Sequence, residues 1–192
     1  MTHKKSHGCG CWFAVVILLA ALVIFAGVLY EGVKRLYPQR FTAYVEASAQ
    51  EFEIDPLLVY AFICTESGFR PNVESWAGAR GLMQITRPTY SWIHSKLEAG
   101  SEENYDLMYD AETNIRYGCY YIATCMKRYR RDVATTAAAY HSGWTTVDTL
   151  LEDEAYSADG ATLDVFPYRN MNRYVEKITF NYRVYQFLYG ER

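Results

Sequence analysis

Residues 61–86 read AFICTESGFRPNVESWAGARGLMQIT and place one acidic residue, Glu66, at the end of an apolar run. Apolar residues just before Glu66 recur at roughly helical spacing, and Pro56 suits a first helical position with Asp55 as its N-cap. Gly68 follows and favours the end of a helix. The pattern therefore predicts a helix whose last turn carries Glu66.

The predicted position of Glu66 disfavours its charged form. The negative end of the helix dipole opposes a carboxylate, and apolar surroundings remove the water that would stabilise it. A carboxyl group that stays neutral near pH 7 can donate a proton to a leaving oxygen. A solvated glutamate at a helix end is the competing interpretation, and the residues that follow favour the catalytic one.

A short apolar segment, residues 82–85, follows Glu66 and is flanked by small residues. Gly78 and Gly81 allow the backbone to approach a ligand closely. Gln84 is a neutral polar side chain that suits hydrogen bonding to a sugar or an amide, and satisfying a buried backbone group is its alternative role. No other stretch has strand character, so we expect a mainly α domain with at most a small β-hairpin beside Glu66.

Three blocks of sequence share their order with a known family. The first runs from Glu66 to Ile85, the second is AAYHSG at residues 138–143, and the third is NRYVEK at residues 172–177. Together they resemble the soluble lytic transglycosylase family (the SLT domain), whose relatives include goose-type lysozyme. The resemblance covers roughly residues 41 to 190 and implies a lysozyme-like fold.

The resemblance also implies a reaction. In the family, one glutamate acts as an acid on the bond from N-acetylmuramic acid (MurNAc) to N-acetylglucosamine (GlcNAc). It then acts as a base on the muramic C6 hydroxyl, which closes on C1 and leaves a 1,6-anhydro end without water. Carried over by position, Glu66 takes both roles. Most glycosidases need a second carboxylate, but surface solvation explains Glu74, Asp110 and Asp148 better than catalysis does.

Five further residues match positions that bind substrate in the family. The resemblance implies that Ser75 and Gln84 hydrogen-bond the substrate, including its N-acetyl group, and that Met83 lines the groove. Tyr140 is expected to lie near the acid and orient it or the sugar, and Tyr174 to help close the groove. The resemblance implies no metal and no organic cofactor.

The second block departs from the family pattern, because His141 stands where the family has Asn and Ser142 where it has Ala. A lone histidine at such a place is more often a hydrogen-bonded structural residue than a catalyst. If His141 approaches Glu66, its titration near neutral pH would alter the pH profile. His141 is therefore a candidate accessory residue.

An uncharged apolar segment of twenty residues runs from Cys11 to Tyr30. At 1.5 Å per residue it spans about 30 Å, the thickness of the hydrocarbon core of a bilayer. Trp12 and Tyr30 lie at its ends, as interfacial aromatic residues do. A cleaved signal peptide is the alternative, but its apolar region would be shorter and no clear cleavage site follows. We therefore expect an uncleaved, single-pass membrane anchor.

These features divide the chain into four predicted parts. They are a short cytoplasmic N-terminus (1–10), a transmembrane anchor (11–30), a linker (31–40) and the lysozyme-like transglycosylase domain (41–192). Basic residues flank both ends of the anchor and leave its orientation open, so the resemblance alone places the domain on the extracytoplasmic side of the cell membrane. Unmodified thiols are expected at Cys9 and Cys11, with lipidation as the alternative.

Charge and cysteine usage limit the partners. Residues 41–192 carry 14 Lys and Arg against 21 Asp and Glu, a net charge of −7, which argues against nucleic acid. The expected partners are peptidoglycan glycan strands and the membrane, and no protein partner is predicted. The four histidines lack metal-site spacing. Cys64, Cys119 and Cys125 are expected to be small buried apolar residues, with a bridge from Cys64 to either of the others as the alternative.

The function predicted here is a membrane-anchored peptidoglycan lytic transglycosylase. A hydrolytic lysozyme (muramidase) on the same fold is the first alternative, and it would leave reducing ends. An inactive cell-wall binding or assembly module is the second. Cleavage at chain ends and cleavage within chains both remain open.

Overall fold

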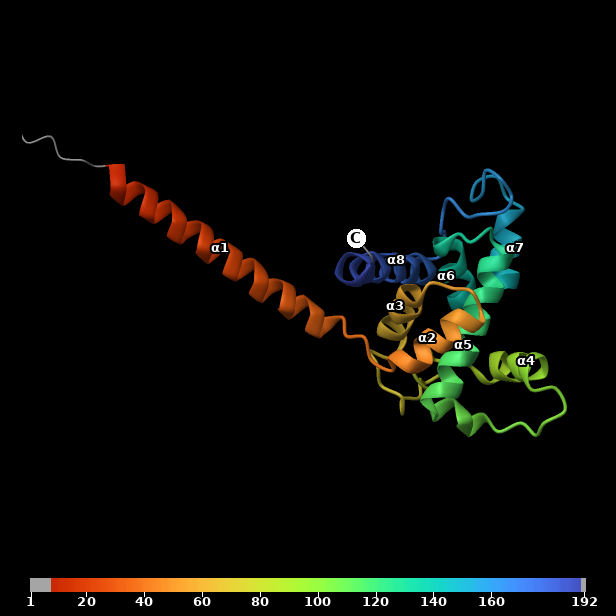
Figure 1. Cartoon of the computed structure of the whole chain (residues 1–192). Coiled ribbons are helices and arrows are strands. Elements are labelled where there is room, and N and C mark those ends of the chain that lie inside the picture. The colour runs from red at the N-terminus through yellow and green to blue at the C-terminus, as the bar shows by residue number, and fades with distance from the viewer. Residues whose placement is uncertain (1–7, 191–192) are drawn as a thin grey trace, which may run out of the picture. The chain divides into compact units, whose positions relative to one another are not determined.

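The computed structural model describes residues 8–190 and the side chains from Trp12 onward. The chain divides into two compact units, Met1–Pro38 and Gln39–Arg192. The predicted cytoplasmic segment, residues 1–10, lies largely outside the described residues, and the side chains of Cys9 and Cys11 lie outside them as well. Figure 1 shows one long helix in the first unit and a bundle of shorter helices in the second.

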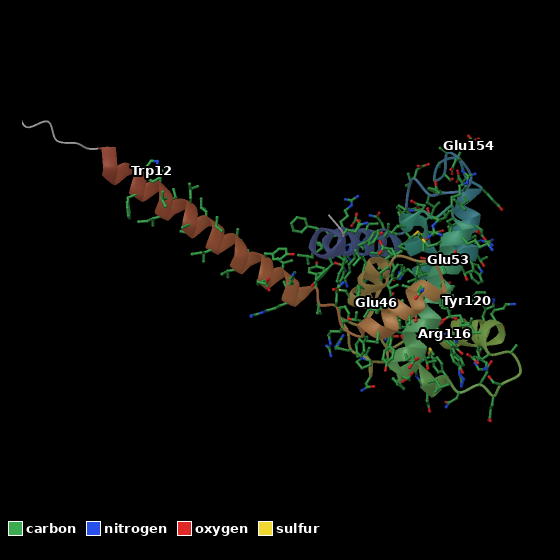
Figure 2. All side chains as sticks on the ribbon, in the orientation of Figure 1. Trp12, Glu46, Glu53, Arg116, Tyr120 and Glu154 are labelled. Carbon is green, nitrogen blue, oxygen red and sulfur yellow. The ribbon has the colours of Figure 1, made fainter. Side chains whose placement is uncertain are left out.

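From residue 8 onward, where the structure describes it, the first unit contains a single helix, α1 (Gly8–Leu36). It extends past the predicted end at Tyr30, because no helix-breaking residue occurs before Pro38. Its residues Trp12–Leu36 are long and apolar enough to cross a membrane by length and composition. Side chains stand out from the ribbon along this helix (Figure 2), and large apolar ones such as Val23 are exposed. An exposed apolar surface of this size is typical of a segment that contacts lipid or another protein.

The second unit is built from helices, in agreement with the predicted fold class. The helix that carries Glu66 packs against the last helix of the chain, which also packs against α6. The elements are α2 (Thr42–Glu51), α3 (Pro56–Glu66), α4 (Arg87–Leu97), the 3₁₀ helix η1 (Tyr105–Tyr109), α5 (Ala111–Arg128), α6 (Val133–Ser142), α7 (Trp144–Leu151) and α8 (Arg169–Tyr189).

The 3₁₀ helix η1 lies in the acidic segment 98–110. The helix α5 ends at Arg128, and soon after it Arg130 and Arg131 have φ values of 51° and 62°, which a right-handed helix does not allow.

The segment between α3 and α4 contains no regular strand within the described chain. Its pairing consists of two isolated antiparallel bridges, Glu74 with Arg80 and Arg80 with Ile85. This agrees with the expectation of at most a small hairpin.

Helix α3 is the centre of the core. Its residues 58–63 are at most 1% exposed, so apolar neighbours surround the helix on all sides before it reaches Glu66. Helix α5 buries the face that carries Ile115, Cys119, Ile122 and Met126. Among the residues described, Cys64, Cys119 and Cys125 are free thiols, and Cys64 is only half-buried.

Candidate active site

Helix α3 places Glu66 by local signals at both of its ends. Asp55 caps the N-terminus by accepting a hydrogen bond from the Leu57 amide at 2.8 Å, and Tyr182 of α8 donates to the same carboxylate at 2.6 Å. The helix ends at Glu66, and Gly68 then takes a φ of 58°. Glu66 therefore lies in the last turn, as predicted.

Helix α8 holds this last turn from the side. The Tyr174 hydroxyl donates a hydrogen bond to Oε1 of Glu66. One turn further on, Lys177 Nζ donates to the Thr65 carbonyl at 3.2 Å, and Asn181 Nδ2 donates to the Thr65 hydroxyl at 2.9 Å. The carboxyl group is thus fixed in orientation by a helix more than one hundred residues away in sequence.

Burial controls the protonation of Glu66. Loss of water raises the pKa of its carboxyl to about 7, although the hydrogen bond from Tyr174 and the charge of Lys177 act in the opposite direction. The side chain is half-buried, so a ligand can still reach it. A carboxyl with this pKa exists near neutral pH in both forms, and it can either donate or accept a proton.

Tyr140 and Tyr174 line the surroundings of Glu66 from α6 and α8. The Tyr140 hydroxyl donates to the Met83 carbonyl at 2.7 Å, and its ring lies 4.8 Å from that of Phe62 and 5.1 Å from that of Tyr121. Burial and the Glu66 carboxyl raise the pKa of both phenols well above the usual value. Both therefore remain neutral hydrogen-bond donors at physiological pH.

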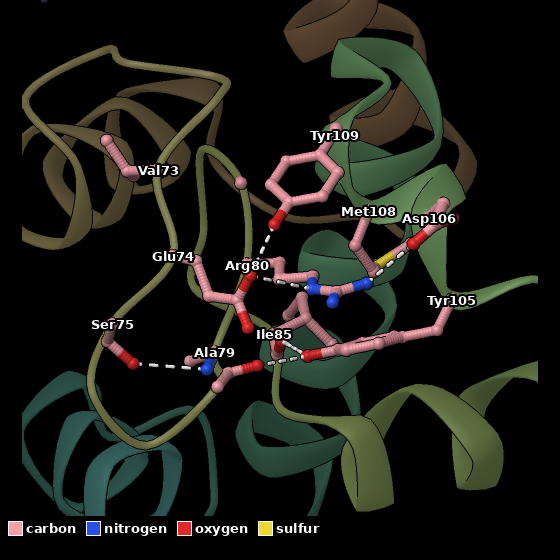
Figure 3. A network of polar contacts seen from close by, with 12 residues as sticks. Val73, Glu74, Ser75, Ala79, Arg80, Ile85, Tyr105, Asp106, Met108 and Tyr109 are labelled. Carbon is pink, nitrogen blue, oxygen red and sulfur yellow. Dashed lines mark hydrogen bonds and ion pairs between the residues drawn. The ribbon is translucent and has the colours of Figure 1, made fainter.

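Ser75 lies in the glycine-rich loop, residues 73–85, which Figure 3 shows from close by. Gln84 belongs to the same loop. The Ser75 hydroxyl accepts a hydrogen bond from the Ala79 amide at 3.1 Å, and Gln84 Nε2 donates to the Gly81 carbonyl at 2.9 Å. Both side chains thus hold the loop, and Gln84 does so with a φ of 50°. No described residue engages the hydroxyl proton of Ser75 or the amide oxygen of Gln84.

Tyr105 of η1 fixes the same loop and was not predicted to matter. Its hydroxyl donates to the carbonyls of Gly78 at 2.6 Å and Ile85 at 2.8 Å (Figure 3). It comes from an acidic segment with no sequence signal that would mark it. The loop is therefore held by a residue outside the matched blocks.

The side chain of Met83 does not line a groove, in contrast to what the family resemblance implied. Its side chain is fully buried and packs against α5 at Gly118, where an added Cβ would overlap the Met83 sulfur. Met83 instead contributes its carbonyl oxygen, which accepts the hydrogen bond from Tyr140. An apolar residue next to Gly81 in a short segment is as well suited to the core as to a groove, and the core contact is the one observed.

The other acids considered as a second carboxylate have partners of their own. Glu74 accepts from the Tyr109 hydroxyl at 2.6 Å, Asp110 caps α5, and Asp148 pairs with Arg128. Hydrogen bonds from Tyr109 and Arg128 respectively lower the pKa of Glu74 and Asp148. None of the three forms a hydrogen bond with Glu66.

His141 lies beside the site without a hydrogen bond to Glu66. Its ring stacks on that of Tyr174, with centroids 4.6 Å apart and planes 17° from parallel. The residue is otherwise exposed, and partial burial lowers the pKa of its imidazole. The ring is therefore neutral at pH 7 and contacts the site through Tyr174.

The sequence matches a family model and several characterised proteins. The model described as "Transglycosylase SLT domain" matches residues 43–160. The soluble lytic murein transglycosylase of Escherichia coli K12 is 25% identical over 91% of this chain and 27% of its own length. The membrane-bound lytic murein transglycosylase C of Haemophilus influenzae is 25% identical over 62% of this chain and 36% of its own length.

Solved structures show the same fold. The 70 kDa soluble lytic transglycosylase of Escherichia coli superposes with a TM-score of 0.74 at 23% identity, over 87% of this chain and 27% of that one. An inactive glutamate-to-glutamine mutant of lytic transglycosylase Slt from Pseudomonas aeruginosa superposes with a TM-score of 0.69 at 20% identity. The superposition covers 81% of this chain and 25% of the Pseudomonas aeruginosa chain. The chain spans about a quarter of the length of the soluble relatives that it matches.

Proposed function

This chain belongs to the transglycosylase SLT domain family, and from that membership we propose that it is a membrane-anchored peptidoglycan lytic transglycosylase. It cleaves the MurNAc–GlcNAc β-1,4 bond without water and leaves 1,6-anhydro-MurNAc ends. The observation that carries this proposal is the half-buried Glu66 carboxyl, with a pKa of about 7 and a hydrogen bond from Tyr174. The inactive glutamate mutant of a related protein supports one essential glutamate.

Glu66 serves in turn as acid and base in the proposed reaction. Its carboxyl proton passes to the glycosidic oxygen, and the bond from that oxygen to C1 of MurNAc breaks. The C6 hydroxyl oxygen of the same sugar then bonds to C1, and its proton passes to the Glu66 carboxylate. This restores the starting state, so the proposed reaction needs no second carboxylate.

Substrate contacts are proposed for the groups that the fold leaves available. The Ser75 hydroxyl proton and the Gln84 amide oxygen suit hydrogen bonds to sugar hydroxyl and N-acetyl groups. Tyr140 and Tyr174 stay neutral phenols beside Glu66, where Tyr140 would orient the acid or the sugar and Tyr174 would help close the groove. His141 is an accessory residue that holds Tyr174 by stacking.

Replacing Tyr174 with Phe is expected to slow cleavage by about 10- to 100-fold, because Glu66 loses the group that orients it. The acid must be protonated at the start, so activity falls as pH rises through the pKa of Glu66. The hydrogen bond from Tyr174 lowers the pKa of Glu66. The variant should therefore lose activity at a higher pH than the parent, which a pH profile of kcat/KM measures.

Tyr182→Phe is the matched control for this change. It removes another hydroxyl of α8 that bonds to a carboxylate, Asp55, away from Glu66. The pH profile of kcat/KM for Tyr182→Phe should coincide with that of the parent. A Tyr174→Phe profile that coincides with that of the control would contradict the role given to Tyr174.

The product distinguishes the proposed reaction from hydrolysis. Digestion of purified peptidoglycan by the full chain in detergent should give fragments lighter by one water than those of a muramidase, without reducing MurNAc ends. Mass spectrometry of the fragments provides the measurement. Reducing ends would favour the lysozyme alternative, and binding without fragments would favour an inactive wall-binding module.

Helix α1 is proposed to be the single membrane span, with the unit Gln39–Arg192 on the extracytoplasmic side. A short N-terminus at residues 1–10 would remain in the cytoplasm, with the anchor near 11–30 and a linker to about residue 40. The membrane-bound relatives support an anchored enzyme. Protease added to intact spheroplasts should degrade the domain. Degradation only after lysis would indicate the opposite topology, with the domain in the cytoplasm.

A further inference from the structure

Two tryptophans border a hollow on the surface of the helical unit, away from the residues assigned above. The hollow has a volume of about 370 Å³ and is lined by Trp92 of α4, Thr124, Lys127 and Arg128 of α5, and Trp144 of α7. The two indole rings meet edge to face with centroids 4.8 Å apart. Each ring is half-buried, so one face of the pair remains accessible.

Aromatic contacts connect this hollow to the candidate active site. Tyr121 lies between them, with its ring 5.7 Å from that of Trp144 and 5.1 Å from that of Tyr140. Tyr140 in turn is an electrostatic neighbour of Glu66. The buried ring of Tyr121 therefore packs against both the Trp92–Trp144 hollow and a residue beside the acid.

Three polar groups at the hollow have no partner among the described residues: the two indole N–H groups and the Lys127 ammonium. No described residue accepts a hydrogen bond from the indole N–H of Trp92 or of Trp144, and none forms an ion pair with the Lys127 ammonium. Arg128 is different, because Asp148 neutralises it. The site thus combines an apolar floor, two unused donors and one unpaired positive charge.

A second hollow extends the same surface along α5. It has a volume of about 580 Å³, shares Thr124 and Lys127 with the first, and adds the ring of Tyr120. The Tyr120 ring lies 5.6 Å from that of Trp92. Lys127 therefore stands at the junction of two adjoining aromatic hollows.

We propose that the Trp92–Trp144 hollow is a second binding site for the peptidoglycan polymer, in which a pyranose ring lies on the indole rings and Lys127 pairs with a carboxylate of the attached peptide stem. This inference rests on the proposed function, which identifies peptidoglycan as the polymer that the chain binds. A pyranose ring offers apolar C–H faces to the floor and hydroxyl acceptors to the indole donors. A lipid chain would leave those donors without partners, and its fit is poorer for that reason.

The test measures binding to the full chain in detergent, in a Glu66→Gln background that prevents cleavage. The probes are a purified glycan oligosaccharide with intact peptide stems and the same oligosaccharide after an amidase has removed the stems. Lys127→Ala should lower the affinity for the stem-bearing probe by about 3- to 10-fold and change the affinity for the stem-free probe by less than about twofold. Trp144→Ala should lower the affinity for both probes by about tenfold or more.

Controls separate binding from folding. Lys96→Ala removes an exposed lysine of α4 outside the hollow and should bind both probes like the parent. Should Trp144→Ala fail to fold, Trp144→Phe keeps an aromatic ring and removes the N–H, so a loss of a few-fold is expected. The proposal is overturned if Lys127→Ala and Trp144→Phe both behave like Lys96→Ala.

Two further outcomes also count against it. If the Glu66→Gln parent binds neither probe, the proposed function itself fails; if the parent binds and the variants match it, only the second site fails. If the full chain self-associates in sedimentation and Trp144→Ala makes it monomeric without changing glycan binding, the occupant is a second copy of the chain.

Discussion

Replacing Glu66 with Gln is expected to reduce the release of fragments from peptidoglycan by roughly 10²- to 10⁴-fold, the range that general acid–base catalysis contributes. Glutamine keeps the size of the side chain and can still accept the hydrogen bond from Tyr174. It cannot donate a proton to the glycosidic oxygen or take one from the C6 hydroxyl. The loss should therefore appear in kcat, while binding of uncut strands persists.

The same substitution should stabilise the fold at alkaline pH. The pKa of Glu66 is raised from 4.5 to about 7 by burial, so the native site favours the neutral carboxyl. The stability that this gives is complete below pH 4.5 and is lost as pH rises through 7. The glutamine side chain of the Glu66→Gln variant carries no charge at any pH, so its free energy of unfolding at pH 8 should exceed that of the parent by up to about 3 kcal/mol, and the gain should vanish below pH 4.5.

Urea unfolding at pH 4 and pH 8, together with turnover of purified sacculi, measures both effects. Glu176→Gln is the control, because it neutralises an exposed glutamate on α8 that bonds only to Asn172. It should change neither quantity. Cleavage by Glu66→Gln at the parental rate would remove the basis of the proposed mechanism.

Local sequence signals explain how α3 could be predicted to its last residue. Asp55 and Pro56 begin the helix and Gly68 follows its end, and each acts within one turn of its own position. The same reasoning applies to α4, which begins after the Thr86 cap. Capping and backbone preference are properties of neighbouring residues, so the helix that carries the acid is visible in the sequence.

Contacts between distant segments were not predictable in the same way. The bond from Tyr174 to Glu66 joins residues 108 positions apart, and only a family resemblance pointed to that tyrosine. Tyr105, which holds the glycine-rich loop, has no such resemblance. The groove position that the family resemblance implied for Met83 is not observed, because a resemblance carries over a residue's place in the chain but not the packing of its side chain, which here is buried against α5.

Asn114 is the buried anchor that joins the glycine-rich segment to α5, and replacing it with Ala is expected to lower the free energy of unfolding by about 3 to 5 kcal/mol. Its side chain is fully buried. Oδ1 accepts from the Met83 amide at 2.8 Å, and Nδ2 donates to the carbonyls of Arg80 at 3.0 Å and Met108 at 2.8 Å. Alanine would leave the Met83 amide and the Met108 carbonyl without partners in the core, while the Arg80 carbonyl would keep only its hydrogen bond from the Ile85 amide.

Asn114→Asp separates the hydrogen bonds from simple packing, because it preserves the volume of the side chain. Aspartate can still accept from Met83, but its second oxygen would face two carbonyl oxygens and cannot donate when charged. It should be at least as destabilising as Ala at pH 7 and regain part of the loss at low pH, where a protonated carboxyl can donate once. Asn72→Ala, at an exposed asparagine, should change the free energy of unfolding by less than about 0.5 kcal/mol. If Asn114→Asp unfolds like the parent at pH 7, the two donor bonds do not hold the segment, and the position of Met83 and its bond from Tyr140 must depend on packing against Gly118 instead.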